Sequence, residues 1–300
     1  HVLKLVANQK ALNFEPGSAY LYCNTGFTLL AEVVSRVSGQ SFSEFTQERI
    51  FEPLHMTHTF FYDDHEKIVK NRAYSYYADG TGYKKSVLSY ATVGATSLFT
   101  TVEDLSLWAM NFENPVVGDR KIMERMNEKG ILNNGDTISY ALGQEIDYYK
   151  GLTFINHGGA DAGYRTFLGR FPDQRFSVIV LSNEASFNPA GMALKIADIY
   201  LKGSLKEISI REATEKEAGN SPSVLADIEM LKSYCGQYEL QPGVIVTVSQ
   251  DQSRLYAEAP GLSKILLNHV NSNEFTLKGA DTRVQFLKNN GGVVDRMKVF

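Results

Sequence analysis

The sequence predicts an α+β fold, with an antiparallel sheet flanked by helices and a small all-β domain, barrel or sandwich, after it. Three observations carry this prediction. Apolar residues recur at helical spacing in the first part of the chain. Four strand-like segments then follow one another and lead directly into a helix, without alternating βα units. Beyond a charged segment, the chain ends in a series of short strand-like segments.

The composition bounds the class of protein. The 300 residues are 43% hydrophobic and 21% charged, which is ordinary for a globular chain of one large domain or two. A net charge of −4 gives no reason to expect nucleic acid as a partner, because phosphate binding needs a concentrated basic surface. Cys23 and Cys235 are expected to be free thiols rather than a disulfide. No apolar run is long enough to cross a membrane.

Helices are expected in five places. The chain begins without Met inside the first of them, HVLKLVANQKAL, which Pro16-Gly17 ends. The second follows Asn24 and stops at Gly39, and Ser41 with Glu44 forms a capping box for the third. The fourth starts at Thr101-Val102-Glu103-Asp104, and the fifth opens at Pro189. Their apolar faces are, in order, Val2, Leu5, Val6 and Leu12; Phe27, Leu30, Ala31, Val34 and Val37; Phe42 and Phe45; Leu105, Trp108 and Phe112; and Met192, Ile196 and Tyr200.

Residues 61–95 are expected to be a long irregular excursion rich in tyrosine, and loops of this length are usually functional or mobile. The predicted strands after it are ISYALGQEI, LTFINHGG, YRTFLGRF and FSVIVLSN, within residues 138–183. The predicted domains are residues 1–202, an exposed charged linker over 203–230, and the small β-domain over 231–300. The strands of the β-domain are CGQYEL, VIVTVSQ, RLYAEA, KILLNHV, EFTLKG, RVQFLK and VVDRMKVF.

Two short segments carry residues suited to catalysis. In the first, Tyr20-Leu21-Tyr22-Cys23-Asn24, the tyrosine at position 22 can be core, exposed or a proton-transfer group, and Asn24 is most simply a helix N-cap. In the second, His157-Gly158-Gly159 ends a predicted strand. This segment is typical either of a turn with an exposed imidazole or of an edge strand whose glycines let a substrate backbone approach.

Taken together, three blocks resemble the class C β-lactamase and penicillin-binding-protein superfamily of bacterial-type active-site serine hydrolases. The first block is EPGSAYLYCNTGFTLLAEVVSRVSGQSFSEFTQERIFEPLHMTHTFF. The second is GATSLFTTVEDLSLWAMNF, and the third is YALGQEIDYYKGLTFINHGGADAGYRTFLGRFPDQRFSVIVLSN. The resemblance covers residues 1–202 and implies a β-lactamase/transpeptidase-like fold. Tyr234-Cys235-Gly236-Gln237-Tyr238 resembles the start of the small β-domain often appended to these hydrolases.

The signature set of these enzymes is Ser-x-x-Lys, a Ser-Asp-Asn-type motif and Lys-Thr-Gly. Tyr22-Cys23-Asn24 matches the second motif and His157-Gly158-Gly159 the third. No lysine of the chain has a serine three residues before it, so the first motif is absent. We therefore expect the chain to lack the N-terminal segment that carries the nucleophilic serine, and to be inactive by itself.

The resemblance implies a role for each matched residue. The missing serine attacks a carbonyl and forms an acyl-enzyme, and Tyr22, its pKa lowered by the missing lysine, moves the serine proton. Asn24 binds the substrate's amide and orients the lysine. His157 shares the proton network of Tyr22, or meets a substrate carboxylate if charged. The strand over Gly158, Gly159 and Ala160 supplies a backbone N–H for the oxyanion, and water then releases the acyl group.

Two departures from the family pattern bear on the chemistry. Cys23 replaces the serine usual at the middle of the second motif, and we interpret it as a conservative small residue rather than a reactive thiol. His55 stands where the family usually has glycine, three residues before His58. We do not expect a metal site there, since no third ligand is spaced for one. The sequence thus predicts no cofactor and no metal.

The sequence therefore predicts a serine hydrolase that acts on an amide, lactam or ester, of β-lactamase, esterase or D-amino-acid peptidase type. The alternative is a ligand-binding protein that kept the cleft and lost the nucleophile. The expected partners are a small-molecule or peptide substrate and the missing N-terminal segment of the same protein. The resemblance implies an exported protein, periplasmic or extracellular.

Overall fold

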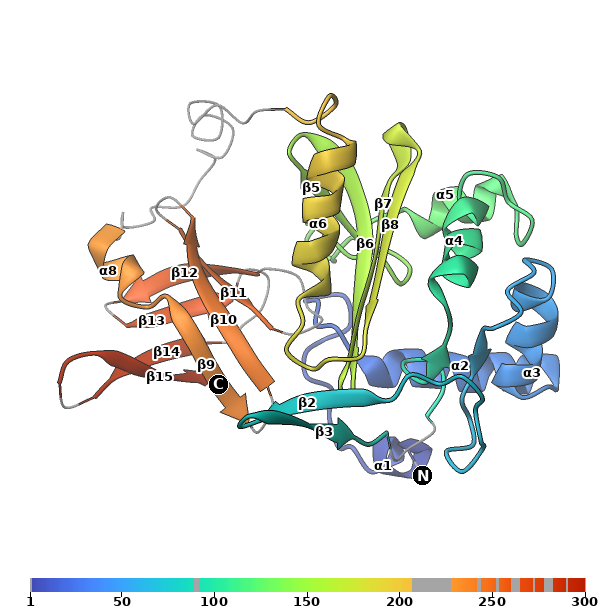
Figure 1. Ribbon diagram of the computed structural model, residues 1–300, viewed down its shortest axis with the longest axis horizontal. Helices are drawn as coiled ribbons and strands as arrows, with labels where there is room; N and C mark the ends of the chain where they lie inside the picture. The colour runs from blue at the N-terminus through green and yellow to red at the C-terminus, as the bar shows by residue number, and fades with distance from the viewer. Residues whose placement is uncertain are drawn as a thin grey trace.

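The computed structural model describes residues 2–88, 92–206, 228–241, 244–251, 254–259, 265–271, 273–277, 283–289 and 291–299. These residues form a body of helices around a sheet and a second body of strands beside it (Figure 1). The predicted α+β fold is confirmed, and the C-terminal strands make a nearly closed antiparallel barrel.

The helices of the first body are α1 (Val2–Ala7), α2 (Asn24–Ser38), α3 (Phe42–Thr46), the π-helix η1 (Gln47–Phe51), α4 (Val102–Asn111), α5 (Arg120–Met126), the 3₁₀ turn η2 (Pro172–Gln174) and α6 (Pro189–Tyr200). Its strands are β1 (Phe60–Phe61), β2 (Ser75–Asp79), β3 (Gly82–Ser86), β4 (Leu98–Phe99), β5 (Glu145–Tyr149), β6 (Leu152–Asp161), β7 (Tyr164–Phe171) and β8 (Phe176–Ser182).

The central sheet is antiparallel, with strand order β5-β6-β7-β8. Large side chains of β6, β7 and β8 point to the face that α6 covers, where Ala193 and Ala197 of the helix are fully buried. Small residues on the buried side of α6 let the helix axis approach the aromatic side chains closely. Pro189 occupies the first turn, and Asn188 caps the helix by accepting a hydrogen bond from the backbone N–H of Gly191 at 2.7 Å.

Three local predictions about helix ends are confirmed. Gly39 adopts the left-handed conformation that ends α2, with φ of 76°. Ser41 and Glu44 form both bonds of the capping box that starts α3. Thr101 caps α4 through the backbone N–H of Asp104.

The structure contains helix α5 and the short strands β1 and β4, which were not predicted, and it differs from the sequence-based expectation in three further places. The first helix ends at Ala7 in a tightened turn, with Asn8 N–H bonded to Leu5 C=O, and Leu12 lies beyond it. Residues 61–95 contain the hairpin β2–β3, whose turn is Gly80-Thr81 with a positive φ at Gly80. Of the segment ISYALGQEI, strand β5 includes only the end, because residues 138–144 turn back on themselves.

Asp104 joins α4 to the segment before β1. Its side chain is 4% exposed, and Oδ2 accepts hydrogen bonds from the backbone N–H of His58 at 2.8 Å and the hydroxyl of Thr59 at 2.7 Å. Replacing Asp104 with alanine removes the acceptor of both donors, one of which is the buried hydroxyl of Thr59, so the free energy of unfolding is expected to fall by about 1–3 kcal/mol. Urea denaturation measures the change. Glu103→Ala on the same turn is the control, since Glu103 is exposed, and an equal loss in both variants would contradict the prediction.

The second body contains α8 (Ile228–Lys232), β9 (Gly236–Gln241), β10 (Val244–Asp251), β11 (Arg254–Glu258), β12 (Ile265–Asn271), β13 (Glu274–Leu277), β14 (Arg283–Lys288) and β15 (Val294–Val299). All seven predicted strands are present, each paired antiparallel with its neighbour in sequence. Alternate residues point inward, because successive side chains of a strand face opposite sides.

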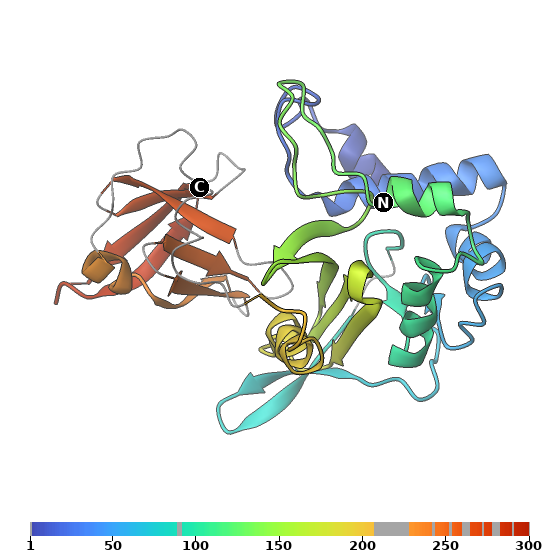
Figure 2. The ribbon, with the colours of Figure 1, turned by 90° about the horizontal axis from the view of Figure 1, so that it is seen from above.

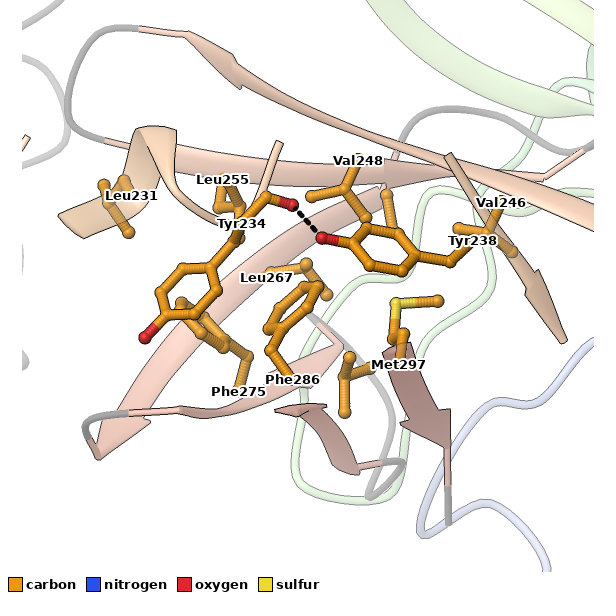
Figure 3. Close-up of a cluster of buried hydrophobic side chains, with 12 residues drawn as sticks. Leu231, Tyr234, Tyr238, Val246, Val248, Leu255, Leu267, Phe275, Phe286 and Met297 are labelled. Carbon is orange, nitrogen blue, oxygen red and sulfur yellow. Dashed lines mark hydrogen bonds between the residues drawn. The ribbon is translucent and has the colours of Figure 1, made fainter. Parts of the chain in front are cut away.

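Aromatic rings fill the barrel (Figure 3). Phe275 and Phe286 are fully buried, and Tyr234 stacks on Phe286 with ring centroids 4.7 Å apart. The buried hydroxyl of Tyr238 donates to the backbone C=O of Tyr234 at 2.8 Å, and burial raises the pKa of Tyr238 to about 12. An aromatic core therefore occupies the inside of the barrel.

Much of the predicted linker, residues 207–227, lies outside the described residues, and α8 begins at Ile228 inside its predicted range. The domain boundaries therefore stay predictions. Among the helices that the structure describes, none has the length and apolar character needed to cross a membrane. Cys23 and Cys235 are free thiols, as expected, and both are exposed.

Candidate active site

Tyr22 lies in the loop that leads into α2. Asn133 holds this loop in place, since its backbone N–H donates to Gly17 C=O at 2.8 Å and its side-chain amide to Pro16 C=O at 2.9 Å. The two segments run together in Figure 2, the first in dark blue and the second in green. The ring of Tyr22 packs on Phe27 at 6.3 Å between centroids and stays 37% exposed. The phenol is thus fixed by packing and still open to a substrate.

The structure brings Tyr22 and His157 together, although they are far apart in sequence. Their ring centroids are 5.7 Å apart. His157 lies on β6, so the interpretation of His157-Gly158-Gly159 as a turn is wrong and the strand interpretation is correct. Strand β5 pairs with β6 only up to Asn156, so along residues 157–160 none of the described strands pairs with that edge of β6.

Two hydrogen bonds orient the ring of His157. Nδ1 is 2.7 Å from the backbone oxygen of Gly158, which can only accept, so Nδ1 carries the proton. Nε2 forms a hydrogen bond with the hydroxyl of Tyr140, 3.0 Å away. The imidazole is oriented from both sides, and its second nitrogen is engaged by Tyr140 rather than by Tyr22.

Tyr140 is a site residue that the sequence reasoning missed. It is buried, its ring packs edge-on to Tyr22 at 5.8 Å, and Tyr20 stacks on it at 5.4 Å. We call Tyr20, Tyr22, Tyr140 and His157 the tyrosine–histidine cluster. The sequence offered no spacing signal for Tyr140, because it lies in a turn that was expected to be a strand.

A buried arginine supports the segment that carries Tyr140. Arg170 on β7 donates hydrogen bonds to Gln144 and to Asn127, and lies 3.6 Å from the ring centre of Phe112. Burial lowers the pKa of Arg170 to about 10, so the guanidinium stays charged at neutral pH. Gln144 in turn accepts the backbone N–H of Ala141 at 2.8 Å through its own C=O. The turn from Tyr140 to Gln144 is therefore anchored to the sheet.

The surroundings of the phenols favour their neutral form. Burial raises the pKa of Tyr22 above its usual value, and the carboxylate of Glu145 and the thiol of Cys23 raise it further. The pKa values of Tyr20 and Tyr140 are raised as well, again mainly by burial. The described residues thus act opposite to the lowering that the family resemblance implies for Tyr22, and a cation would have to offset them.

Asn24 is the first residue of α2 and is exposed. The interpretation of Asn24 as the N-cap is wrong, because Cys23 occupies that position and makes no side-chain capping bond. The side-chain amide of Asn24 is therefore not used for capping and is available for a ligand.

The three proposed oxyanion residues continue β6 along the open edge. On the neighbouring strand β7, the residues opposite Gly158, Gly159 and Ala160 are Phe167, Thr166 and Arg165 in that order. A β-carbon at Gly159 would lie 2.4 Å from the hydroxyl oxygen of Thr166, so the glycine matches a close approach between the strands.

No three His, Cys, Asp or Glu side chains converge as metal ligands anywhere in the part of the chain that the structure describes. His58 contacts the hydroxyl of Thr57 through Nδ1 at 3.2 Å. We assign no metal to His55 and His58.

Comparisons with known proteins agree with this architecture. The chain is 28% identical over 294 residues to a penicillin-binding protein of Bacillus subtilis (strain 168), covering 91% of this chain and 62% of that protein. It is 26% identical over 196 residues to a D-aminopeptidase of Cereibacter sphaeroides, covering 65% of this chain and 38% of the relative. The chain thus spans less than two thirds of the length of either relative.

Among solved structures, the octameric penicillin-binding protein homologue from Pyrococcus abyssi superposes with a TM-score of 0.58 at 22% identity, covering 95% of this chain and 66% of the other. This likeness shows the β-lactamase/transpeptidase-like fold. Residues 222–300 match the model of a domain of unknown function, DUF3471. Residues 4–200 match the Beta-lactamase family model, and the chain therefore belongs to the Beta-lactamase family of serine hydrolases.

Proposed function

We propose that this chain carries the second and third motifs of a serine hydrolase that cleaves an amide, lactam or ester through an acyl-enzyme. The nucleophilic serine and its lysine would lie in a segment outside these 300 residues. The observation that carries the proposal is the meeting of Tyr22 and His157, with ring centroids 5.7 Å apart, at the open edge of β6. The absence of Ser-x-x-Lys from the sequence agrees with it.

In the proposed reaction the serine hydroxyl loses its proton to Tyr22 as its oxygen attacks the carbonyl carbon. The lysine ammonium offsets the burial and the carboxylate of Glu145, which otherwise keep the phenol neutral. Backbone N–H groups over Gly158–Ala160 hold the oxyanion, and Asn24 binds the substrate's amide. Tyr22 returns the proton to the leaving group, and water then hydrolyses the acyl-enzyme.

His157 has a narrower role in this proposal than the family resemblance implies. Nδ1 donates to Gly158 C=O and Nε2 is hydrogen-bonded to the hydroxyl of Tyr140, so both ring nitrogens are engaged. We propose that it positions Tyr140 and the start of the oxyanion strand, rather than exchanging a proton with Tyr22.

An activity-based probe tests the proposal. A fluorophosphonate is expected to label the protein from the complete reading frame at a serine of a Ser-x-x-Lys motif, and to leave the 300-residue chain unlabelled. A complete reading frame without that motif, or one that the probe does not label, would overturn the proposal. The protein would then be a ligand-binding member of the family.

We propose further that the partners are a small-molecule or peptide substrate and the segment with the serine, and that the protein is exported. The names of two relatives support the proposed class of substrate. One is named a penicillin-binding protein and another a D-aminopeptidase, so D-amino-acid amides and peptides are the first substrates to assay.

A further inference from the structure

Strand β2 crosses the end of the central sheet at which β6 turns into β7 (Figure 1). Its backbone is fixed to the segment after β8. Tyr76 N–H donates to Asn183 C=O at 2.8 Å, and Ala185 N–H donates to Tyr76 C=O at 2.9 Å. Strand β2 is therefore a fixed support for the turn that contacts it.

The turn between β6 and β7 rests on β2 at Gly163. Gly163 N–H donates to the hydroxyl oxygen of Ser75 at 3.0 Å, and Ser75 is only 1% exposed. The Ser75 hydroxyl donates its own proton to Ser86 C=O on β3 at 3.1 Å, so its oxygen is left to accept. A β-carbon at Gly163 would lie 2.7 Å from the backbone oxygen of Tyr76. The two backbones thus approach each other as closely as a glycine allows.

The turn itself has a strained conformation. Ala162 has a φ of 46°, in the left-handed region that is unfavourable for a residue with a side chain. The buried Arg165 donates from Nη1 to Ala162 C=O at 3.1 Å and to Tyr164 C=O at 2.7 Å. The hydroxyl of Tyr164 donates to Ala73 C=O, just before β2, at 2.8 Å. Strain of this kind persists where surrounding contacts fix the backbone, and Ser75 supplies one of them.

The strand that this turn ends carries the proposed oxyanion donors. Ala160 lies three residues before Gly163, so at about 3.4 Å per residue the two are within about 10 Å. Alternate N–H groups of a paired strand point away from the partner strand, so Gly158, Gly159 and Ala160 include at least one that points away from β7. Along residues 157–160 none of the described strands holds that edge, so its position depends on β7 and on the turn.

We propose that Ser75 is a positioning residue for the oxyanion strand, because it holds Gly163 on β2 and so fixes where the N–H donors of β6 lie. The claim about catalysis rests on the proposed function, whereas the contact between Ser75 and the turn does not. Preorganised donors stabilise an oxyanion only at their working distance. A misplacement of about 1 Å can cost about 10²-fold in rate.

Amide hydrogen exchange in the 300-residue chain tests the contact itself. Ser75→Ala removes the acceptor of Gly163 N–H, so exchange at residues 159–164 is expected to quicken about tenfold. Residues 152–156 pair with β5 as well as with the sheet and should keep their rates. Thr46→Val is the matched control, since Thr46 is 3% exposed and its hydroxyl bonds only within α3. Unchanged exchange at 159–164 in Ser75→Ala, or an equal rise at 152–156, would overturn the inference.

Acylation of the protein from the complete reading frame tests the consequence for catalysis. The oxyanion forms only after the substrate has bound, so Ser75→Ala should lower the acylation rate constant about 10–100-fold and change the dissociation constant of the substrate by less than about twofold. Rapid mixing over a range of substrate concentrations separates the two constants. A loss confined to the dissociation constant would contradict the positioning role.

A second variant and a count of active sites separate positioning from folding. Gly163→Ala pushes the turn away from the backbone of Tyr76 and leaves Ser75 in place, so it should slow acylation as Ser75→Ala does. Fluorophosphonate labelling carried to completion counts the folded sites. In Ser75→Ala the final labelling should match the parent protein while its rate falls. Reduced final labelling with an unchanged rate per labelled site would show a folding effect and refute the inference.

The outcomes also separate this inference from the proposed function. Labelling of the parent protein together with an unchanged acylation rate in Ser75→Ala would refute the positioning role and leave the hydrolase standing. Faster exchange in Ser75→Ala together with a parent protein that the probe does not label would refute the hydrolase and the claim about catalysis, and would leave Ser75 as a structural contact of the turn.

Discussion

Replacing Tyr22 with phenylalanine, in protein that includes the upstream serine, is expected to slow acylation by about 10²–10⁴-fold, the range for loss of a general acid–base group. The substitution removes only the phenolic oxygen. The ring keeps its packing on Phe27 and Tyr140, so the fold is expected to stay intact. Rapid-mixing measurements of acyl-enzyme formation with an ester and an amide substrate give the acylation rate directly.

Tyr148→Phe is the matched control, because Tyr148 lies on β5 of the same sheet and is 74% exposed. Its acylation rate should equal that of the parent protein. The far-ultraviolet circular dichroism and the unfolding midpoint of both variants should also match the parent. Unchanged acylation in Tyr22→Phe would remove Tyr22 from the mechanism, whatever its distance from His157.

Replacing Phe171 with alanine is expected to lower the free energy of unfolding by about 3–5 kcal/mol, the cost of removing a large aromatic side chain from a core. Phe171 is completely buried at the end of β7. Its ring stacks on Phe154 at 4.7 Å and lies within the cluster that joins the sheet to α6. The alanine variant leaves a cavity that the surrounding strands can fill only in part.

Chemical denaturation monitored by circular dichroism measures this loss, with Phe171→Leu as a graded comparison that should lose less. Leu12→Ala serves as the surface control and should change stability by less than about 0.5 kcal/mol, since Leu12 is 72% exposed. A small loss in Phe171→Ala would show that the packing of α6 on the sheet contributes little to stability.

Local sequence signals were sufficient where the fold depends on nearby residues. Gly39 ended α2 and Ser41 with Glu44 started α3, because caps are made by groups a few residues apart. The barrel strands were also predictable, since their alternation and turn residues are local. The hairpin β2–β3 could also have been predicted, because Gly80 stands at the first position of the two-residue turn Gly80-Thr81, where a positive φ is required.

The same signals failed where long-range contacts decide the conformation. The segment of Tyr140 has the composition of a strand, yet Gln144 and Arg170 hold it in a turn. The interpretation of Asn24 as an N-cap followed residue preference, and the structure places the cap one residue earlier. The turn at Tyr140 could not be predicted from spacing, because it depends on Arg170, a partner distant in the chain.

The sequence by itself determined the family, most of the helices and strands, and the identity of Tyr22 and His157 as candidate catalytic residues. All of these follow from motifs and periodicity, which are properties of the linear sequence. Only the tertiary structure decided that Tyr140 occupies Nε2 of His157, that burial and Glu145 keep Tyr22 neutral, and that Ser75 holds the turn at the end of β6. Proximity, burial and charge arise from folding in three dimensions, so no linear pattern contains them.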